Sequence, residues 1–222
     1  FWFFVPTITL CVFLLFASYH FGKEDSEIMI LQESFLLKFI YFIKGSLVIS
    51  APLFFQFNET ISIFEFLNFN VDLLSFLGGE YIIKIFFYSS LLSNMYFLIE
   101  KKSIRYNSGF IFSDMFSISL LYYLLSPLVA FTLYFCFIHS FRHSVSLINQ
   151  LDKNCFKEGF KKFIKKALPL TIITAILFLV AVYFLKNYYV LDTAISKVIF
   201  IGLASLTFPH ILLEYLLEKN EK

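Results

Sequence analysis

Charged residues are scarce in this sequence of 222 residues. Asp, Glu, Lys and Arg make up 15% of the chain, whereas a soluble domain carries about 25%. The three cysteines, Cys11, Cys136 and Cys155, stand at spacings typical of neither a disulfide framework nor a zinc site. The net charge of +2 says little by itself, because the placement of the charges matters more. We expect no nucleic-acid partner.

Apolar residues are abundant instead. They make up 59% of the chain, 33 residues are phenylalanine, and the mean hydropathy is +0.79. A helix needs about 20 apolar residues to cross a bilayer, and the chain contains several such runs. We therefore expect an all-α integral membrane protein in which residues 1–222 form a single membrane domain.

The apolar runs predict a polytopic bundle of about seven transmembrane helices. The third run is the least secure, because polar residues such as Glu65 and Asp72 lie within it. The fifth contains Ser126 followed by Pro127, and the missing backbone donor of a proline should kink that helix. The predicted spans lie near residues 1–19, 34–55, 60–78, 80–99, 114–139, 168–186 and 195–217.

The distribution of basic residues predicts the sidedness. If all seven segments cross, most Lys and Arg residues outside the spans fall on the side that carries residues 20–33, 140–167 and the C-terminus. That side is expected to be cytoplasmic.

On the same side, residues 153–167 place Phe and Ile at helical spacing with lysines between them. This pattern predicts an amphipathic helix in the membrane interface on anionic lipid, with a solvated basic loop as the alternative.

The sequence begins at Phe1, inside an apolar run. No basic leader precedes this run, so it does not have the pattern of a signal peptide. We expect the natural protein to have further residues before it.

All four histidines fall near one predicted membrane face. His20 ends the first span, His139 and His143 end the fifth, and His210 lies near the end of the seventh. This arrangement requires the third segment to cross, because otherwise His20 would lie at the opposite face. Taken singly, each histidine is most simply an interfacial residue.

Each histidine also has a polar partner one helical turn away, on the same helix face. The expected pairs are His20 with Glu24, His139 with His143, and His210 with Glu214. Imidazole is a common metal ligand, and a carboxylate behind it can fix its tautomer. Three such pairs at one depth favour a shared metal site over isolated interfacial histidines.

Arg142 lies between His139 and His143. Two interpretations are open for its guanidinium group. The favoured one is an anchor to lipid headgroups, and the alternative is an ion-pair partner for Asp25 or for a glutamate.

Several stretches together resemble the Brp/Blh family of bacterial and archaeal membrane proteins, named for bacterio-opsin-related proteins and similar to beta-carotene 15,15'-dioxygenases. The resemblance covers nearly all of the chain. The stretches are YHFGKED around His20, KGSLVISAPLFFQFNET at 44–60, SPLVAFTLYFCFIHSFRH at 126–143 and TFPHILLEY at 207–215.

The resemblance implies a multi-pass enzyme of the inner membrane with its histidine cluster near the cytoplasmic face. The implied reaction is cleavage of beta-carotene by dioxygen at the central double bond, with retinal as product and a rhodopsin as its possible recipient. The implied cofactor is non-haem Fe²⁺. His20, His139 and His143 match positions regarded as iron ligands, and His210 matches a histidine of less settled role.

The carboxylates near these histidines are expected to contact the metal ligands without binding the metal themselves. Arg142 would have the same kind of role if it pairs with one of these carboxylates. Asp25 matches the aspartate of an HFGxxD-like motif, and Glu24 and Glu214 lie one turn from a histidine. The chain departs from the family in two places. It lacks an earlier PHGxxD motif, which we expect to lie before Phe1, and it has Gln56 where many relatives have histidine.

Three other classes of function are considered. A membrane di-iron hydroxylase needs about eight histidines, and this chain has four. A haem-binding electron-transfer subunit would hold haem between His20 and one other histidine, which leaves the pair of histidines at 139 and 143 unexplained. A carotenoid- or retinal-binding protein without turnover fits a chain that lacks one ligand, and only an assay separates it from the enzyme.

Overall fold

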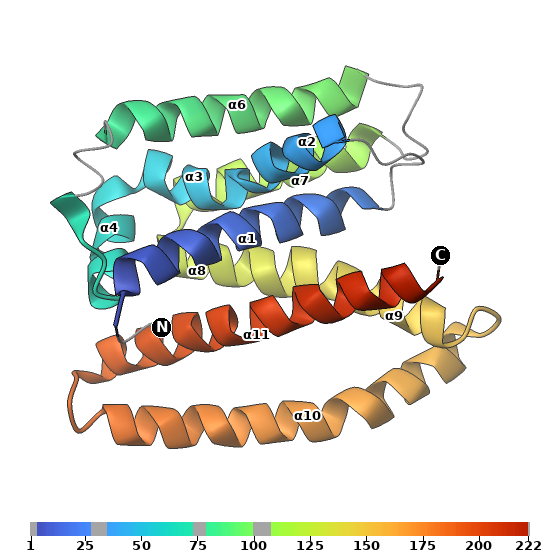
Figure 1. Cartoon of the computed structure of the whole chain (residues 1–222). Helices are drawn as coiled ribbons and strands as arrows, with labels where there is room; N and C mark the ends of the chain where they lie inside the picture. The colour runs from blue at the N-terminus through green and yellow to red at the C-terminus, as the bar shows by residue number, and fades with distance from the viewer. Residues whose placement is uncertain (1–3, 28–34, 73–78, 100–107, 222) are drawn as a thin grey trace.

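The computed structural model describes residues 4–27, 35–72, 79–99 and 108–221 of the chain. Within these ranges the regular structure is helical and no β-strand occurs. Most of the helices lie side by side along one common direction (Figure 1). The predicted all-α class is confirmed.

The helices follow one another with short connections. α8, the π-helix η1 and α9 form one continuous helical segment, and α2 and α3 are separated only by Ser46. In chain order the elements are α1 (Pro6–Glu27), α2 (Phe35–Gly45), α3 (Leu47–Phe55), α4 (Phe57–Phe66), α6 (Gly79–Ile99), α7 (Ser108–Leu124), α8 (Pro127–Leu133), η1 (Tyr134–Ser140), α9 (Phe141–Leu151), α10 (Phe156–Leu185) and α11 (Leu191–Glu221).

The described part of the third predicted span, residues 60–72, does not cross the bundle as one helix, and residues 73–78 lie outside the described ranges. The helix breaks at Gln56, where Tyr41–Phe55 and Phe57–Phe66 meet at 109°. α4 then ends at Phe66, after 10 residues. Asn68 adopts a left-handed backbone with φ of 62°, a conformation that commonly terminates helices. The predicted span was therefore wrong over its described residues, 60–72. Asn68 and Asn70 lie in the turn after α4, and the backbone N–H of Asn70 donates to the hydroxyl of Thr7 near the start of α1.

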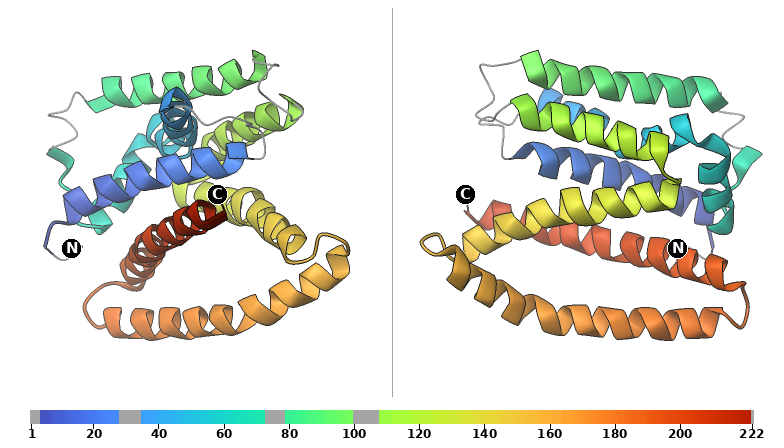
Figure 2. Two further views of the ribbon diagram at one scale, coloured as in Figure 1. Left: turned by 45° about the vertical axis from the view of Figure 1, so that its right-hand side comes forward. Right: turned by 180° about the vertical axis from the view of Figure 1, so that it is seen from behind.

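The fifth predicted span, residues 114–139, is two helices and not one kinked helix. Ser126 has an extended backbone (ψ of 150°) and Pro127 starts α8, as expected for a residue before proline. Figures 1 and 2 show α8 running back in the direction opposite to α7. The side-chain amide of Gln56 donates to the carbonyls of Tyr122 and Leu125 at this reversal, and so satisfies acceptors that the end of α7 leaves without helical partners.

These two errors cancel in their effect on topology. The described residues 60–72 do not cross the bundle, whereas the predicted fifth span crosses it twice, as α7 and as the α8–η1–α9 segment. The later helices therefore keep their expected direction (Figure 1). The histidine-bearing parts of α1, η1, α9 and α11 therefore lie toward the same end of the bundle (Figure 1). The histidines therefore still come together, although the third segment does not cross over its described residues.

Small residues allow α1 and α2 to touch through their backbones. A Cβ atom on Gly22 would overlap the carbonyl of Tyr41, and one on Gly45 would overlap the carbonyl of Ser18. Ser18 and Gly22 are four residues apart on α1, the spacing of the small-residue contacts that join membrane helices. This contact sets the position of the last turns of α1, which carry His20, Glu24 and Asp25.

The core lies between α1, α3, α6, α7 and the α8–η1 segment. Its largest fully buried side chains include Tyr122 and Tyr134. Ala17 and Ala51 let neighbouring helices approach closely. The buried cluster consists of Ala17, Phe21, Leu47, Val48, Ala51, Phe87, Met115, Ile118, Tyr122, Ala130 and Tyr134.

The surface carries many large apolar side chains. In α10, at the edge of the bundle (Figure 1), no residue of the most apolar stretch is buried. Within the described ranges, α10 alone is by itself long and apolar enough to cross a membrane, and the bent pair Tyr41–Phe55 and Phe57–Phe66 passes the same test when taken together. The predicted number of about seven spans is therefore not confirmed.

The basic stretch 153–167 is not a separate element in the structure. α10 begins at Phe156 and continues without interruption to Leu185, so most of the stretch forms its first turns. Phe156, Phe160 and Ile164 are exposed there. Their position in the membrane interface stays a prediction.

Candidate functional site

The fold brings all four histidine rings into one cluster. The ring centroid of His20 lies 5.4 Å from that of His139 and 5.3 Å from that of His210. The rings of His143 and His210 are 5.5 Å apart. His20 and His139 are each only 7% exposed, whereas His210 is exposed. Three separate parts of the chain, α1, the η1–α9 segment and α11, supply the cluster.

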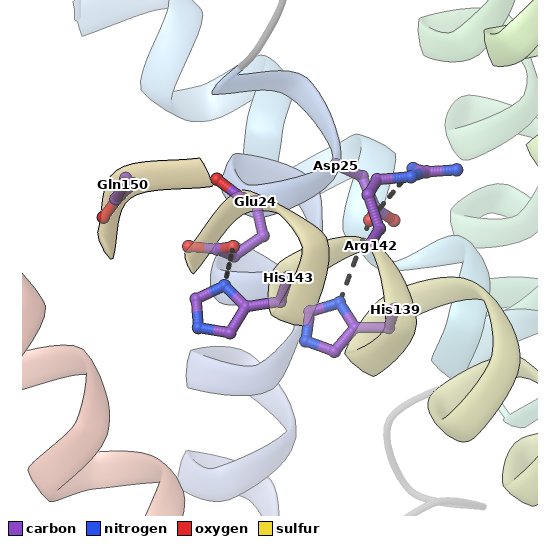
Figure 3. Close-up of a pocket in the computed structure, with 7 residues that line it drawn as sticks. Glu24, Asp25, His139, Arg142, His143 and Gln150 are labelled. Atoms are coloured by element: carbon purple, nitrogen blue, oxygen red, sulfur yellow. Dashed lines mark hydrogen bonds and ion pairs between the residues drawn. The ribbon is translucent and has the colours of Figure 1, made fainter. Parts of the chain in front are cut away.

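His139 lies in a π-helix. The spacing of His139 and His143 predicts regular α-helical turns between them, but η1 extends over Tyr134–Ser140 and α9 begins only at Phe141. π-helical turns are rare and occur often at functional sites. Figure 3 shows each of the two rings with its Nδ1 edge turned toward the carboxylate that it contacts and its other edge turned away from that carboxylate.

Carboxylates from α1 contact the two histidines of the η1–α9 segment. Glu24 Oε2 lies 2.9 Å from Nδ1 of His143, and Asp25 Oδ1 lies 3.8 Å from Nδ1 of His139. The sequence pairs Glu24 with His20 and His139 with His143, each within one helical segment. The contacts of Glu24 and Asp25 with Nδ1 of His143 and His139 join different helices, and the sequence did not predict them.

Asp25 is the centre of a buried polar network. The hydroxyl of Tyr134 donates to its Oδ2 at 3.2 Å, and Nη1 of Arg142 lies 3.5 Å from its Oδ1. The ammonium group of Lys44 donates to its backbone carbonyl at 3.1 Å. A carboxylate held from several sides keeps a fixed orientation toward His139.

Arg142 binds Asp114 on α7 in a bidentate manner. Nη1 and Nη2 lie 2.9 and 2.8 Å from the two carboxylate oxygens. The favoured interpretation of Arg142 as a lipid anchor was therefore wrong, and the alternative, a partner for Asp25, was correct but incomplete. Asp114, Lys44 and Tyr134 were not among the residues predicted for the site. The signal was present for the first two, because an ionisable residue inside an apolar segment generally faces the protein interior.

The carboxylate side of the cluster opens into a polar cavity of about 290 Å³. Figure 3 shows the charged groups of Glu24, Asp25 and Arg142 grouped above the two histidine rings. The cavity is lined by Glu24, Asp25, His139, Arg142, His143, Ser146 and Gln150.

A larger apolar groove of about 840 Å³ lies between the α8–η1 segment, α10 and α11. One of its lining residues, Phe135, stacks on His139 with a centroid distance of 5.7 Å. Phe131, another lining residue, stacks on Phe135 at the same distance. The groove thus reaches the histidine cluster along a row of aromatic rings.

The donors suit iron in their chemistry. Imidazoles bind iron well, and a carboxylate at Nδ1 leaves the other ring nitrogen for a metal. Because an imidazole nitrogen lies about 2 Å from its metal, rings on one ion have centroids within about 6 Å, and the three measured pairs meet this limit. Among the described side chains, however, no three His, Cys, Asp or Glu residues form a ready metal-binding group. Glu214 lies outside the described side chains.

Comparison with known proteins agrees with the composition of the site. A family model described as beta-carotene 15,15'-dioxygenase matches residues 1–218. The beta-carotene 15,15'-dioxygenase of uncultured marine bacterium 66A03 is 29% identical over 221 residues, which cover 96% of this chain and 73% of that protein. No solved structure matches the chain. Since the family model spans nearly every residue, the chain belongs to the beta-carotene 15,15'-dioxygenase family.

Proposed function

We propose that this protein cleaves beta-carotene at its central double bond with dioxygen and releases two molecules of retinal. The observation that carries the proposal is the position of four clustered imidazoles at the end of an apolar groove. Family membership and the name of the marine relative support the same reaction. Each carbon of the broken double bond takes one oxygen atom of the dioxygen molecule.

Ferrous iron is the cofactor in this proposal, with His20, His139 and His143 as its ligands and His210 as a fourth candidate. Bound iron would supply the activation of dioxygen, which by itself reacts slowly with a closed-shell polyene. Glu24 and Asp25 hold the rings of His143 and His139 by their Nδ1 atoms. This contact favours the tautomer with a proton on Nδ1, which leaves Nε2 as the donor to the metal.

The apolar groove is the proposed site of the polyene. Its walls are mainly aliphatic and aromatic side chains of three helices, and its volume lies in the range of ligand pockets, about 300–1,000 Å³. A rigid apolar substrate gains its binding free energy from burial along such a wall. The depth to which the polyene enters the groove then determines whether its central double bond lies beside the histidine cluster.

Membrane lipid is the proposed surrounding of the protein, in the inner membrane of a bacterium or archaeon. The exposed apolar surface of α10 supports contact with hydrocarbon. Beta-carotene dissolves in the same hydrocarbon, so a groove between helices can admit it from the side. Transfer of retinal to a rhodopsin, and a cytoplasmic location of the histidine cluster, belong to the same proposal.

The direct test is expression of the full chain in a bacterium that makes beta-carotene. We expect the orange colour to fade and retinal to accumulate in the extract. A chain that binds carotene without turnover would keep the colour and yield no retinal, and a haem-binding protein would show a Soret band after purification. Either result would contradict the proposal.

A side chain at position 202 should block the groove without disturbing the fold. Gly202 lines the groove, and a Cβ atom placed on it meets no other atom within 4 Å. We expect Gly202→Trp to lower retinal formation by at least about tenfold, because the indole would occupy space that the polyene needs. The measurement is retinal per unit of folded protein in membranes.

Leu179→Trp is the matched control, because it adds the same indole to an exposed position of α10 outside the groove lining. It should leave retinal formation unchanged. Equal rates in the Gly202→Trp variant and the wild type would show that the substrate takes another route.

A further inference from the structure

We infer that Asp114 is a positioning residue that holds the histidine cluster in its metal-binding arrangement, acting through Arg142 and Asp25. The inference rests on the proposed metal site, but not on the identity of the substrate. Asp114 lies on α7, which supplies no histidine, and its carboxylate is buried.

The first step is the bidentate contact of Asp114 with Arg142. Both carboxylate oxygens accept from the guanidinium, at 2.9 and 2.8 Å, the planar geometry that makes such pairs strong and directional. Arg142 immediately precedes His143 in the first turn of α9. The contact therefore ties the turn that carries His143 to a neighbouring helix.

The second step runs from Arg142 to Asp25. Nη1, the nitrogen that binds Asp114 at 2.9 Å, also lies 3.5 Å from Oδ1 of Asp25. The same Oδ1 lies 3.8 Å from Nδ1 of His139. Without Asp114 the guanidinium would turn toward Asp25, its remaining carboxylate, and compete with His139 for that oxygen.

The third step concerns charge. Two carboxylates, Asp25 and Asp114, face two cations, Arg142 and Lys44, in this buried network. Loss of the Asp114 charge leaves one excess positive charge next to the imidazoles. A cation bound by those imidazoles would then be repelled, and the repulsion is weakly screened because the groups are buried.

If Asp114 only joined α7 to α9, its contact with Arg142 would stabilise the fold but would affect neither the orientation of Asp25 nor the charge near the imidazoles. The two roles are separated by exchanging the partners. In the double variant Asp114→Arg with Arg142→Asp, the ion pair between the helices is restored. A carboxylate then stands beside Asp25 in place of the guanidinium, so the contact that orients Asp25 is lost.

The experiment uses the full chain, purified in detergent, with Co²⁺ as the probe. Affinity is followed by the visible absorption of bound Co²⁺, and folding by the midpoint of thermal unfolding. We expect Asp114→Asn to remain folded and to bind Co²⁺ about 10–100-fold more weakly, the usual loss when a residue behind a metal ligand is changed. The exchanged double variant should regain thermal stability without regaining affinity.

Glu80→Gln is the matched control. It removes one carboxylate charge from an exposed ion pair with Lys84, 3.0 Å long, on α6, and should change neither affinity nor stability. Wild-type Co²⁺ affinity in Asp114→Asn, or affinity that returns together with stability in the double variant, would overturn the inference. A wild-type chain that binds Co²⁺ but forms no retinal would reject the proposed function alone, and one that binds no Co²⁺ would reject both.

Discussion

Replacement of His139 or of His143 by alanine is expected to abolish retinal formation while the protein still enters the membrane. Each change removes a proposed ligand from a cluster that has only four imidazoles. The loss should exceed about 100-fold, beyond the 10–100-fold typical of a residue that only orients a ligand. Retinal is measured by chromatography of membrane extracts, and insertion by the amount of protein in the membrane fraction.

Phe137→Ala provides a control within the same π-helix. Its side chain is 72% exposed and lines neither the polar cavity nor the apolar groove. The variant should form retinal as the wild type does. Retinal at wild-type rates from both histidine variants would refute their assignment as ligands, even if the chain proved to be a carotenoid-cleaving enzyme.

Substitution of alanine for Gly22 or for Gly45 is expected to disrupt the fold and the site together. The added methyl group would overlap a backbone carbonyl of the facing helix, that of Tyr41 or of Ser18, and backbone atoms cannot move aside as a flexible side chain can. Overpacking of a close contact costs about 1–3 kcal/mol, or more where the backbone must shift. We expect a lower midpoint of thermal unfolding and loss of both Co²⁺ binding and retinal formation.

The joint loss has a specific cause. The last turns of α1 carry His20, Glu24 and Asp25, and α1 is held in place there by its contact with α2. Gly202→Ala is the control for folding, since its new methyl group meets open space, and its unfolding midpoint should not change. If Gly22→Ala unfolds at the wild-type temperature, the backbone contact between α1 and α2 is not as close as the structure shows.

The four histidines of the candidate site were predictable, but the contacts that hold them between helices were not. His20, His139, His143 and His210 stood out because ionisable residues are rare in apolar segments. Their partners were assigned along each helix, from the rule that residues four apart share a face. In the structure Glu24 contacts His143 across helices, and Arg142 contacts Asp114, 28 residues before it in the chain. Such contacts depend on which helices are neighbours, and local spacing carries no information about that.

The chain reversals also could not be predicted from local sequence. Hydropathy identifies where a helix is apolar, but it does not show whether a proline kinks the helix or turns the chain back. At Pro127 the reversal is supported by Gln56, whose amide reaches carbonyls 66 and 69 residues further along the chain. The break at residue 56 and the reversal at residue 126 therefore stabilise each other. Neither could be deduced from its own segment.

The amino-acid sequence by itself determined the helical class, the apolar character of the surface and the set of four histidines, because composition and apolar periodicity are local properties. It also carried the motifs that place the chain in its family. Only the tertiary structure decided which carboxylate contacts which imidazole, where the chain turns back, and that Asp114 belongs to the site. The reason is physical. Burial of a polar group requires a partner, and that partner can come from any helix that packing brings near.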